Sequence, residues 1–129
     1  MVEQHVEIGV PQQILDSLPD DDNAEEDMKR AVAGLEAQLN QAIESADSEG
    51  EAAGYVVDTL ERLEEHLERY DEFVPELRAW GQSPIYAIAW RNLQADLILQ
   101  IHDHDWLSGH VDRERNQRIV EDGIRFGGR

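Results

Sequence analysis

Histidine and aspartate are concentrated in one short stretch, HDHDWLSGHVD, which covers residues 102–112. Imidazole nitrogens and carboxylate oxygens bind zinc and related ions, and a site needs three or four of them converging on one point. The candidate ligands are His102, His104, His110 and Asp103, with Asp105 and Asp112 close by. If they converge, the chain is a metal-dependent hydrolase built on the cluster from His102 to Asp105.

Helical spacing argues against this metal site. Residues two apart on a helix are separated by about 200° around its axis, so His102 and His104 cannot share an ion there. The helical zinc pattern places two histidines four residues apart, whereas the residue four after His102 is Trp106. Both rings would reach one side only if the chain had left the helix by residue 102. We therefore expect these histidines to form the polar end of a buried helix, with no metal, no cofactor and no enzymatic activity.

A resemblance keeps the metal alternative open. The stretch LILQIHDHD resembles the apolar helix followed by His-Asp of HD-domain metal phosphohydrolases, which are all-helical. That resemblance implies an earlier histidine and a later aspartate as further ligands, for which His66 and Asp122 are the candidates. Other chemistry has no support, because the sequence contains no cysteine, no glycine-rich phosphate loop and no G-x-S-x-G.

The charge composition indicates a protein adapted to high salt. The net charge is −18 over 129 residues, and a single lysine (Lys29) accompanies ten arginines. In molar salt the Debye length falls to about 3 Å, so the self-repulsion of an acidic surface is screened. The alternative is an acidic mesophilic protein that mimics nucleic acid or binds a basic partner. No signal peptide or membrane span is expected, which places the chain in the cytoplasm of a halophile or in a virion assembled there.

The elements that would position these residues are predicted to be helices in one all-α domain, residues 1–129. Residues 1–10 alternate apolar and polar side chains and should form a short strand or extended arm. Residues 23–74 should form a long antiparallel αα-hairpin, residues 75–122 shorter helices, and residues 123–129 a tail. Pro75 should open a new short helix, and Gly81 should end it.

The hairpin rests on two heptad seams, each with apolar residues spaced alternately by four and three positions. The first comprises Met28, Val32, Leu35, Leu39, Ala42 and Ala46, and the second Val56, Leu60, Leu63, Leu67, Tyr70 and Val74. Asn23 with Glu26, and Ser48 with Glu51, have the spacing of capping boxes at the two helix starts. We expect the two seams to cover each other.

The helix that follows Pro84 is apolar around most of its circumference, which is typical of a helix buried in its domain or in a subunit interface. This pattern predicts a homo-oligomer. The predicted interface residues are Ile85, Ile88, Trp90, Leu97, Trp106, Arg125, Phe126 and Arg129. The arginine-rich end could dock on the acidic face of a neighbouring copy, whereas nucleic acid is disfavoured because phosphate contacts weaken steeply with salt.

The stretch VPQQILDSLPDDDNAEEDMKRAVAGLEAQLN, residues 10–40, resembles the opening of tailed-virus head–tail adaptor (connector) proteins. The resemblance implies a small helical bundle that forms a ring beneath the portal, with extended ends that reach neighbouring subunits. Residues 125–129 would then face the portal, and the host would be a haloarchaeon.

The sequence thus predicts a non-enzymatic structural subunit of a halophilic assembly. Its partners would be copies of itself and other proteins of that assembly, with no membrane. A cytoplasmic partner-binding or regulatory protein is the main alternative, and the metal-dependent hydrolase is the other.

Overall fold

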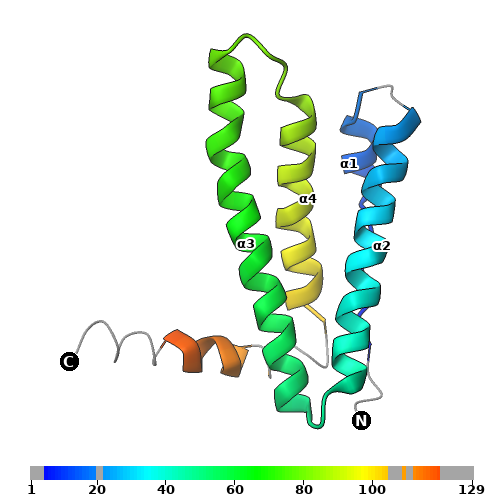
Figure 1. Cartoon of the computed structure of the whole chain (residues 1–129), viewed down its shortest axis with the longest axis vertical. Coiled ribbons are helices and arrows are strands. Elements are labelled where there is room, and N and C mark those ends of the chain that lie inside the picture. The colour runs from blue at the N-terminus through cyan, green and yellow to red at the C-terminus, as the bar shows by residue number, and fades with distance from the viewer. Residues whose placement is uncertain (1–4, 20–21, 105–108, 110–111, 120–129) are drawn as a thin grey trace, which may run out of the picture.

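The chain folds as an all-α helical bundle, as predicted (Figure 1). The computed structural model describes residues 5–19, 22–104, 109 and 112–119. The helices are α1 (Gln12–Ser17), α2 (Asp22–Ser45), α3 (Glu49–Ala79) and α4 (Ile85–His102). Residues 112–119 are also helical and lie beside the lower part of α3; we call them the docked segment. No helix in the described ranges is both long and apolar enough to cross a membrane.

The α2–α3 hairpin is confirmed, and so is the cap at the start of its second arm. The Ser48 hydroxyl accepts a hydrogen bond from the Glu51 N–H at 3.1 Å, and the Glu51 carboxylate accepts one from the Asp47 N–H at 3.1 Å. The first of these bonds satisfies a donor that the helix start leaves unpaired, and the second ties the residue before the cap to the first turn. The other predicted cap is wrong, because α2 begins at Asp22 and Asn23 therefore lies inside it.

Helix α3 continues through Pro75 to Ala79, so the predicted break at Pro75 does not occur. Proline removes one N–H from the helix ladder, but the remaining bonds and the burial of Leu77 carry the helix one turn further. Beyond the C-cap Trp80, Gly81 turns the chain away from the helix with φ +75°. The Gly81 N–H donates to the Arg78 carbonyl at 3.1 Å and the Gln82 N–H to the Leu77 carbonyl at 2.9 Å, the two bonds of a Schellman motif.

The two hairpin seams do not cover each other over their whole length. Near the turn, the fully buried Ala46 and Ala52 let α2 and α3 approach closely. Further up, α4 lies between them, and α3 packs more extensively on α4 than on α2 (Figure 1). Leu63 is buried, whereas Leu67, in the upper half of the second seam, is only partly buried. Helix α4 thus finds most of its cover within its own chain.

The N-terminal residues 5–11 form an extended arm along the bundle and no strand. Val6 is fully buried. The Asn40 side chain accepts from the Val6 N–H at 2.7 Å and donates to the Val6 carbonyl at 2.9 Å. Gln100 does the same for Gly9, at 3.0 and 2.9 Å. Side-chain amides from α2 and α4 thus replace the pairing that a neighbouring strand would give, and this arm packs on its own chain.

Candidate protein-interaction surfaces

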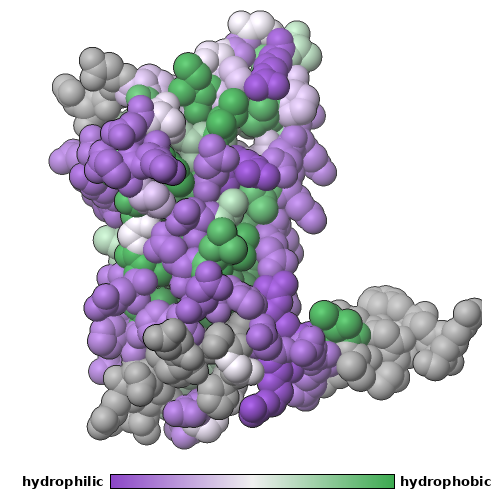
Figure 2. All heavy atoms as spheres, turned by 180° about the vertical axis from the view of Figure 1, so that it is seen from behind, coloured by the Kyte–Doolittle hydropathy of each residue, from purple (hydrophilic) through white to green (hydrophobic). Residues whose placement is uncertain are grey.

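Three exposed apolar side chains flank the α3–α4 turn. The exposed fraction is 63% for Trp80, 46% for Ile85 and 41% for Tyr86. The Schellman turn at Gly81 separates Trp80, at the end of α3, from the first turn of α4, which carries the other two. Figure 2 shows hydrophobic side chains on the surface near this end of the bundle. We call Trp80, Ile85 and Tyr86 the apical patch.

The apical patch lies in the longest stretch of the sequence without a charged residue. Residues 79–90 contain no Asp, Glu, Lys or Arg, although 31% of the chain is charged. Arginines flank the stretch on both sides: Arg78 is exposed, and Arg91 is ion-paired with Asp71 at 2.8 Å. Interface centres are depleted in charge and enriched in tryptophan, tyrosine and arginine. This local absence of charge is the signal by which sequence reasoning could have included Trp80 and Tyr86.

The residues predicted for an interface are divided between surface and core. Ile85 is exposed, and Ile88 and Trp90 are partly buried. Leu97 is only 2% exposed and packs in the core of its own chain, so it is not available to a partner. The other predicted interface residues, Trp106, Arg125, Phe126 and Arg129, lie outside the described residues.

The histidine-rich stretch begins where α4 ends. His102 is the last helical residue and Asp103 is the C-cap, so the chain leaves the helix directly after His102. The His102 Nε2 atom lies 2.9 Å from Asp112 Oδ1 and its Nδ1 atom 3.8 Å from Asp103 Oδ1. His102 thus ties the end of α4 to the start of the docked segment.

The metal alternative gains no further ligand from the described part of the chain. No group of three histidines or carboxylates there could hold a metal ion. His104 is partly buried, whereas His110 and Asp105 lie outside the described residues. Of the two further ligands implied by the HD-domain resemblance, His66 lies on α3 in the wall of a groove described below, and Asp122 lies outside the described residues.

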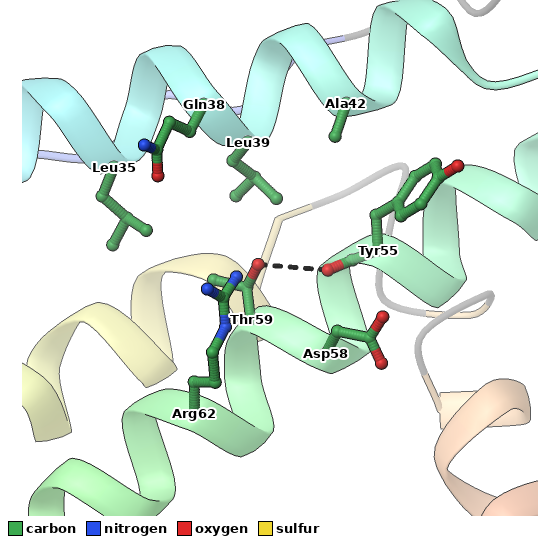
Figure 3. A pocket seen from close by; sticks show the side chains of 8 residues that line it. All are labelled: Leu35, Gln38, Leu39, Ala42, Tyr55, Asp58, Thr59 and Arg62. Carbon is green, nitrogen blue, oxygen red and sulfur yellow. Dashed lines mark hydrogen bonds between the residues drawn. The ribbon is translucent and has the colours of Figure 1, made fainter.

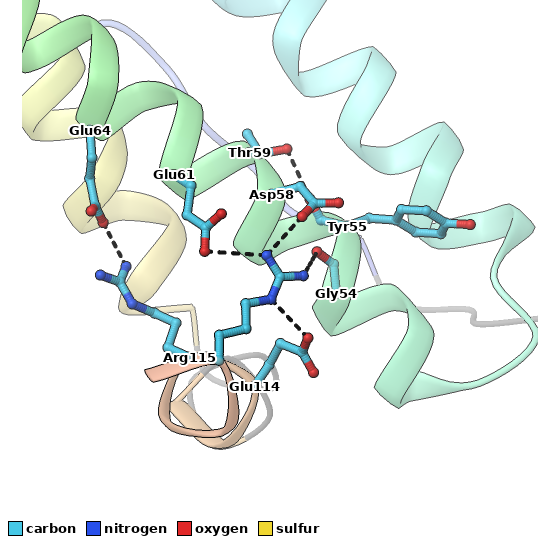
Figure 4. Close-up of polar contacts among 9 residues, drawn as sticks. Gly54, Tyr55, Asp58, Thr59, Glu61, Glu64, Glu114 and Arg115 are labelled. Carbon is cyan, nitrogen blue, oxygen red and sulfur yellow. Dashed lines mark hydrogen bonds and ion pairs between the residues drawn. The ribbon is translucent and has the colours of Figure 1, made fainter. Parts of the chain in front are cut away.

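The docked segment is held to an acidic face of α3 by arginines (Figure 4). Arg118 Nη1 lies 2.8 Å from Asp58 Oδ1 and 3.2 Å from Glu61 Oε1, and its Nε lies 3.0 Å from Glu114 Oε1. Partial burial lowers the pKa of Arg118, but the hydrogen bonds to these carboxylates raise it by more, so the net pKa is above its ordinary value. Arg118 therefore bridges two acidic residues of α3 and one of its own helix.

A second ion pair, Arg115 to Glu64 at 2.7 Å, extends this contact along α3. The sequence suggested that the arginine-rich end could dock on the acidic face of a neighbouring copy. For residues 112–119, the acidic face that they contact belongs to their own chain. Each exposed pair contributes only about 0–1 kcal/mol, so the docking depends on several of them acting together.

A groove runs between α2 and α3. Its lower part has a volume of about 120 Å³ and lies between Leu39 and Ala42 on α2 and Tyr55 and Thr59 on α3 (Figure 3). Its middle part, of about 210 Å³, reaches α4 and shares Leu35 with the lower part.

Past His66 the groove opens into its upper part, a wide depression of about 350 Å³, whose lining residues His66, Arg69, Tyr70 and Phe73 all belong to α3. It adjoins the middle part at His66. Partial burial raises the pKa of Tyr70 above its ordinary value. We call all three parts the α2–α3 groove.

Comparison with known proteins gives a family but no function. No curated protein matches the chain, and no solved structure does. One family model matches residues 1–128, and it describes a family of unknown function (DUF7971). Because this match spans almost the whole chain, the protein belongs to the DUF7971 family.

Proposed function

We propose that this chain is a non-enzymatic subunit of a protein assembly in a halophilic cell, or in a virus of such a cell. It associates with copies of itself through the apical patch. The observation that carries the proposal is the coincidence of exposed Trp80, Ile85 and Tyr86 with the longest uncharged stretch of the sequence.

The charge of the chain favours this surface over any other for self-association. Two copies that each carry a net charge of −18 repel one another, and the repulsion per unit area is smallest where charged side chains are absent. Aromatic side chains at such a point provide a large apolar contact. Arg78, exposed beside the patch, can pair with a carboxylate of the neighbouring copy. Molar salt screens the charge that remains.

A head–tail adaptor ring is the sharper form of this proposal. Its support is the resemblance over residues 10–40, together with the order of elements there: a short helix, α1, precedes a break and the long helix α2. In such a ring, the apical patch would supply the contacts between subunits. The described N-terminal arm would stabilise each subunit by packing on its own helices.

The experiment is a mass measurement by light scattering in molar salt. The wild-type chain is expected to form one defined oligomer, and Ile85→Asp is expected to be a folded monomer. Ile119→Asp is the matched control, because Ile119 is also exposed, at 67%, but lies on the docked segment. A monomeric wild-type chain, or an Ile85→Asp variant that still assembles, would contradict the proposal.

A cytoplasmic partner-binding protein of a halophile is the second candidate. The α2–α3 groove favours it, because a groove with an apolar floor offers a binding surface to a different protein. A monomer in molar salt that binds such a partner would support this candidate over the first.

A further inference from the structure

The middle part of the α2–α3 groove has the form of a seat for a helix. Helix α2 forms one wall, α3 the other, and α4 the floor, with Trp90, Leu93 and Leu97 among its lining residues. The volume of about 210 Å³ is larger than the roughly 150 Å³ of an apolar cavity that accepts benzene. It can therefore take one or two large apolar side chains of an inserted helix.

A buried polar group in this apolar floor points to a specific ligand. Gln94 is 7% exposed, and its side-chain oxygen accepts no hydrogen bond from any described group. A buried carbonyl without a donor is costly, so such groups are rarely left without a partner. An occupant that carries a hydrogen-bond donor at this point, such as Ser, Thr, Asn or Gln, would remove that cost.

The charged residues along the groove are mostly basic, in contrast with the rest of the molecule. Arg62 lines the lower part, and His66 and Arg69 line the upper part. Neither arginine forms an ion pair with another residue of the described ranges. The acidic residue that lines the lower part, Asp58, is already paired with Arg118 at 2.8 Å. The groove therefore favours a ligand with carboxylates, although the net charge of the whole chain repels them.

From these observations we infer that the α2–α3 groove binds an amphipathic helix of another protein, with a specific pattern of side chains. Its apolar face packs on α4, and one polar residue within that face donates a hydrogen bond to Gln94. Carboxylates beside the apolar face pair with Arg62 and Arg69. The inference does not depend on self-association through the apical patch, which lies at the α3–α4 turn.

The hydrogen bond to Gln94 would fix the register of the bound helix. Apolar contacts alone tolerate a shift of the helix along the groove, whereas a single buried polar pair is satisfied in only one position. The arginines would act at the rim, where exposed charges contribute selectivity more than affinity. Binding would thus combine an apolar contact, one positioning bond and a preference for acidic helices.

The test uses two designed helical peptides of about 18 residues, roughly 27 Å long. Both carry leucines on the apolar face and one central glutamine within it. One has glutamates along both flanks, and the other has lysines at the same positions. Binding of each labelled peptide to the full chain is measured by fluorescence anisotropy in molar salt. The acidic peptide is expected to bind with a Kd below ~100 µM, at least ten times more tightly than the basic peptide.

This comparison separates specific binding from general attraction. Molar salt screens the long-range attraction of the net charge of −18 for the basic peptide, whereas ion pairs at contact distance are screened less, so tighter binding of the basic peptide would overturn the inference. The double variant Arg62→Glu, Arg69→Glu should raise the Kd of the acidic peptide about tenfold, which corresponds to about 1.4 kcal/mol of binding free energy. Arg113→Glu is the control, because Arg113 is exposed on the docked segment and does not line the groove. An equal loss for both variants would also overturn it.

Gln94→Leu tests the positioning bond. Replacing an unpartnered buried carbonyl by an apolar group should raise the melting temperature of the free chain. It should also reverse the preference between the acidic glutamine peptide and an otherwise identical peptide with leucine at the centre. An unchanged preference would refute the role of Gln94. If the double arginine variant instead dissociated a wild-type oligomer in light scattering, the occupant would be a second copy, and the inference of a different protein would be wrong.

Discussion

The Asn40 side chain of α2 binds both backbone groups of Val6, accepting from its N–H at 2.7 Å and donating to its carbonyl at 2.9 Å. Val6 is fully buried, so its backbone cannot exchange these bonds for water. One turn earlier on α2, Glu36 accepts from the Ile8 N–H at 2.8 Å. Successive turns of α2 thus hold the arm in an extended conformation.

Removing the Asn40 side chain, which forms both hydrogen bonds to Val6, should release the arm. Asn40→Ala leaves the buried N–H and carbonyl of Val6 without partners, so we expect the free energy of unfolding to fall by about 1–3 kcal/mol. Chemical denaturation measures the loss, and hydrogen exchange should accelerate at Val6. Gln41→Ala, at the exposed neighbouring position, should change the stability by less than about 0.5 kcal/mol. Equal stability of the two variants would show that the Asn40–Val6 hydrogen bonds contribute nothing to the free energy of unfolding.

Leu63 tests the buried part of the second seam. Leu63→Asp places an unpaired charge at a position that is 5% exposed, and it should cost about 3 kcal/mol or more and unfold much of the chain. The same substitution at Leu99, which is 59% exposed on α4, should leave the helical circular dichroism signal unchanged. A folded Leu63→Asp variant would contradict the assignment of this residue to the core.

Arg118 tests the attachment of the docked segment. Arg118→Ala removes hydrogen bonds to Asp58, Glu61 and Glu114, and hydrogen exchange of residues 112–119 should accelerate. The global stability should change by only about 1 kcal/mol, because these pairs are partly solvated. The exposed Arg113 on the same segment provides the control, Arg113→Ala, for which exchange should stay as in the wild type. Unaltered exchange in Arg118→Ala would mean that other contacts hold the segment.

Salt should stabilise the whole fold. With a net charge of −18, lowering the salt concentration from molar to roughly 0.1 M lengthens the Debye length from about 3 to 10 Å and restores self-repulsion. The melting temperature, followed by circular dichroism, should therefore fall on dilution. Sodium chloride and potassium chloride should act alike, because the effect comes from screening. A melting temperature independent of salt would argue against adaptation to high salt.

His104 tests the metal alternative. We expect His104→Ala to keep the wild-type melting temperature and oligomeric mass, because α4 has already ended at His102. Metal content of the purified wild-type chain, measured by mass spectrometry of the elements, should be well below one ion per chain. Stoichiometric zinc that disappears in His104→Ala would revive the histidine stretch as a metal centre.

Local pattern in the sequence predicted the helices and several of their ends. The spacing of apolar residues identified α2 and α3, and Ser48 with Glu51 identified the start of α3. Gly81 was predicted to end a separate short helix, which the structure shows to be the last part of α3. These features depend on residues within one or two turns of each other, which is why they can be read without the fold. The predicted break at Pro75 was wrong for the same reason. The local preference of proline for the first turn of a helix is outweighed by the packing of the residues around it.

The partners of these elements were decided by the tertiary structure. Periodicity shows which face of a helix is apolar but not which other apolar face covers it, so the wedge of α4 between α2 and α3 was not predictable. The N-terminal arm depends on Asn40 and Gln100, which are 34 and 91 residues away from the backbone groups that they bind. The composition determined that the chain is acidic and rich in arginine. Only the fold decided that Arg118 meets the acidic face of its own α3. The charges alone would pair equally well with the acidic face of a neighbouring copy.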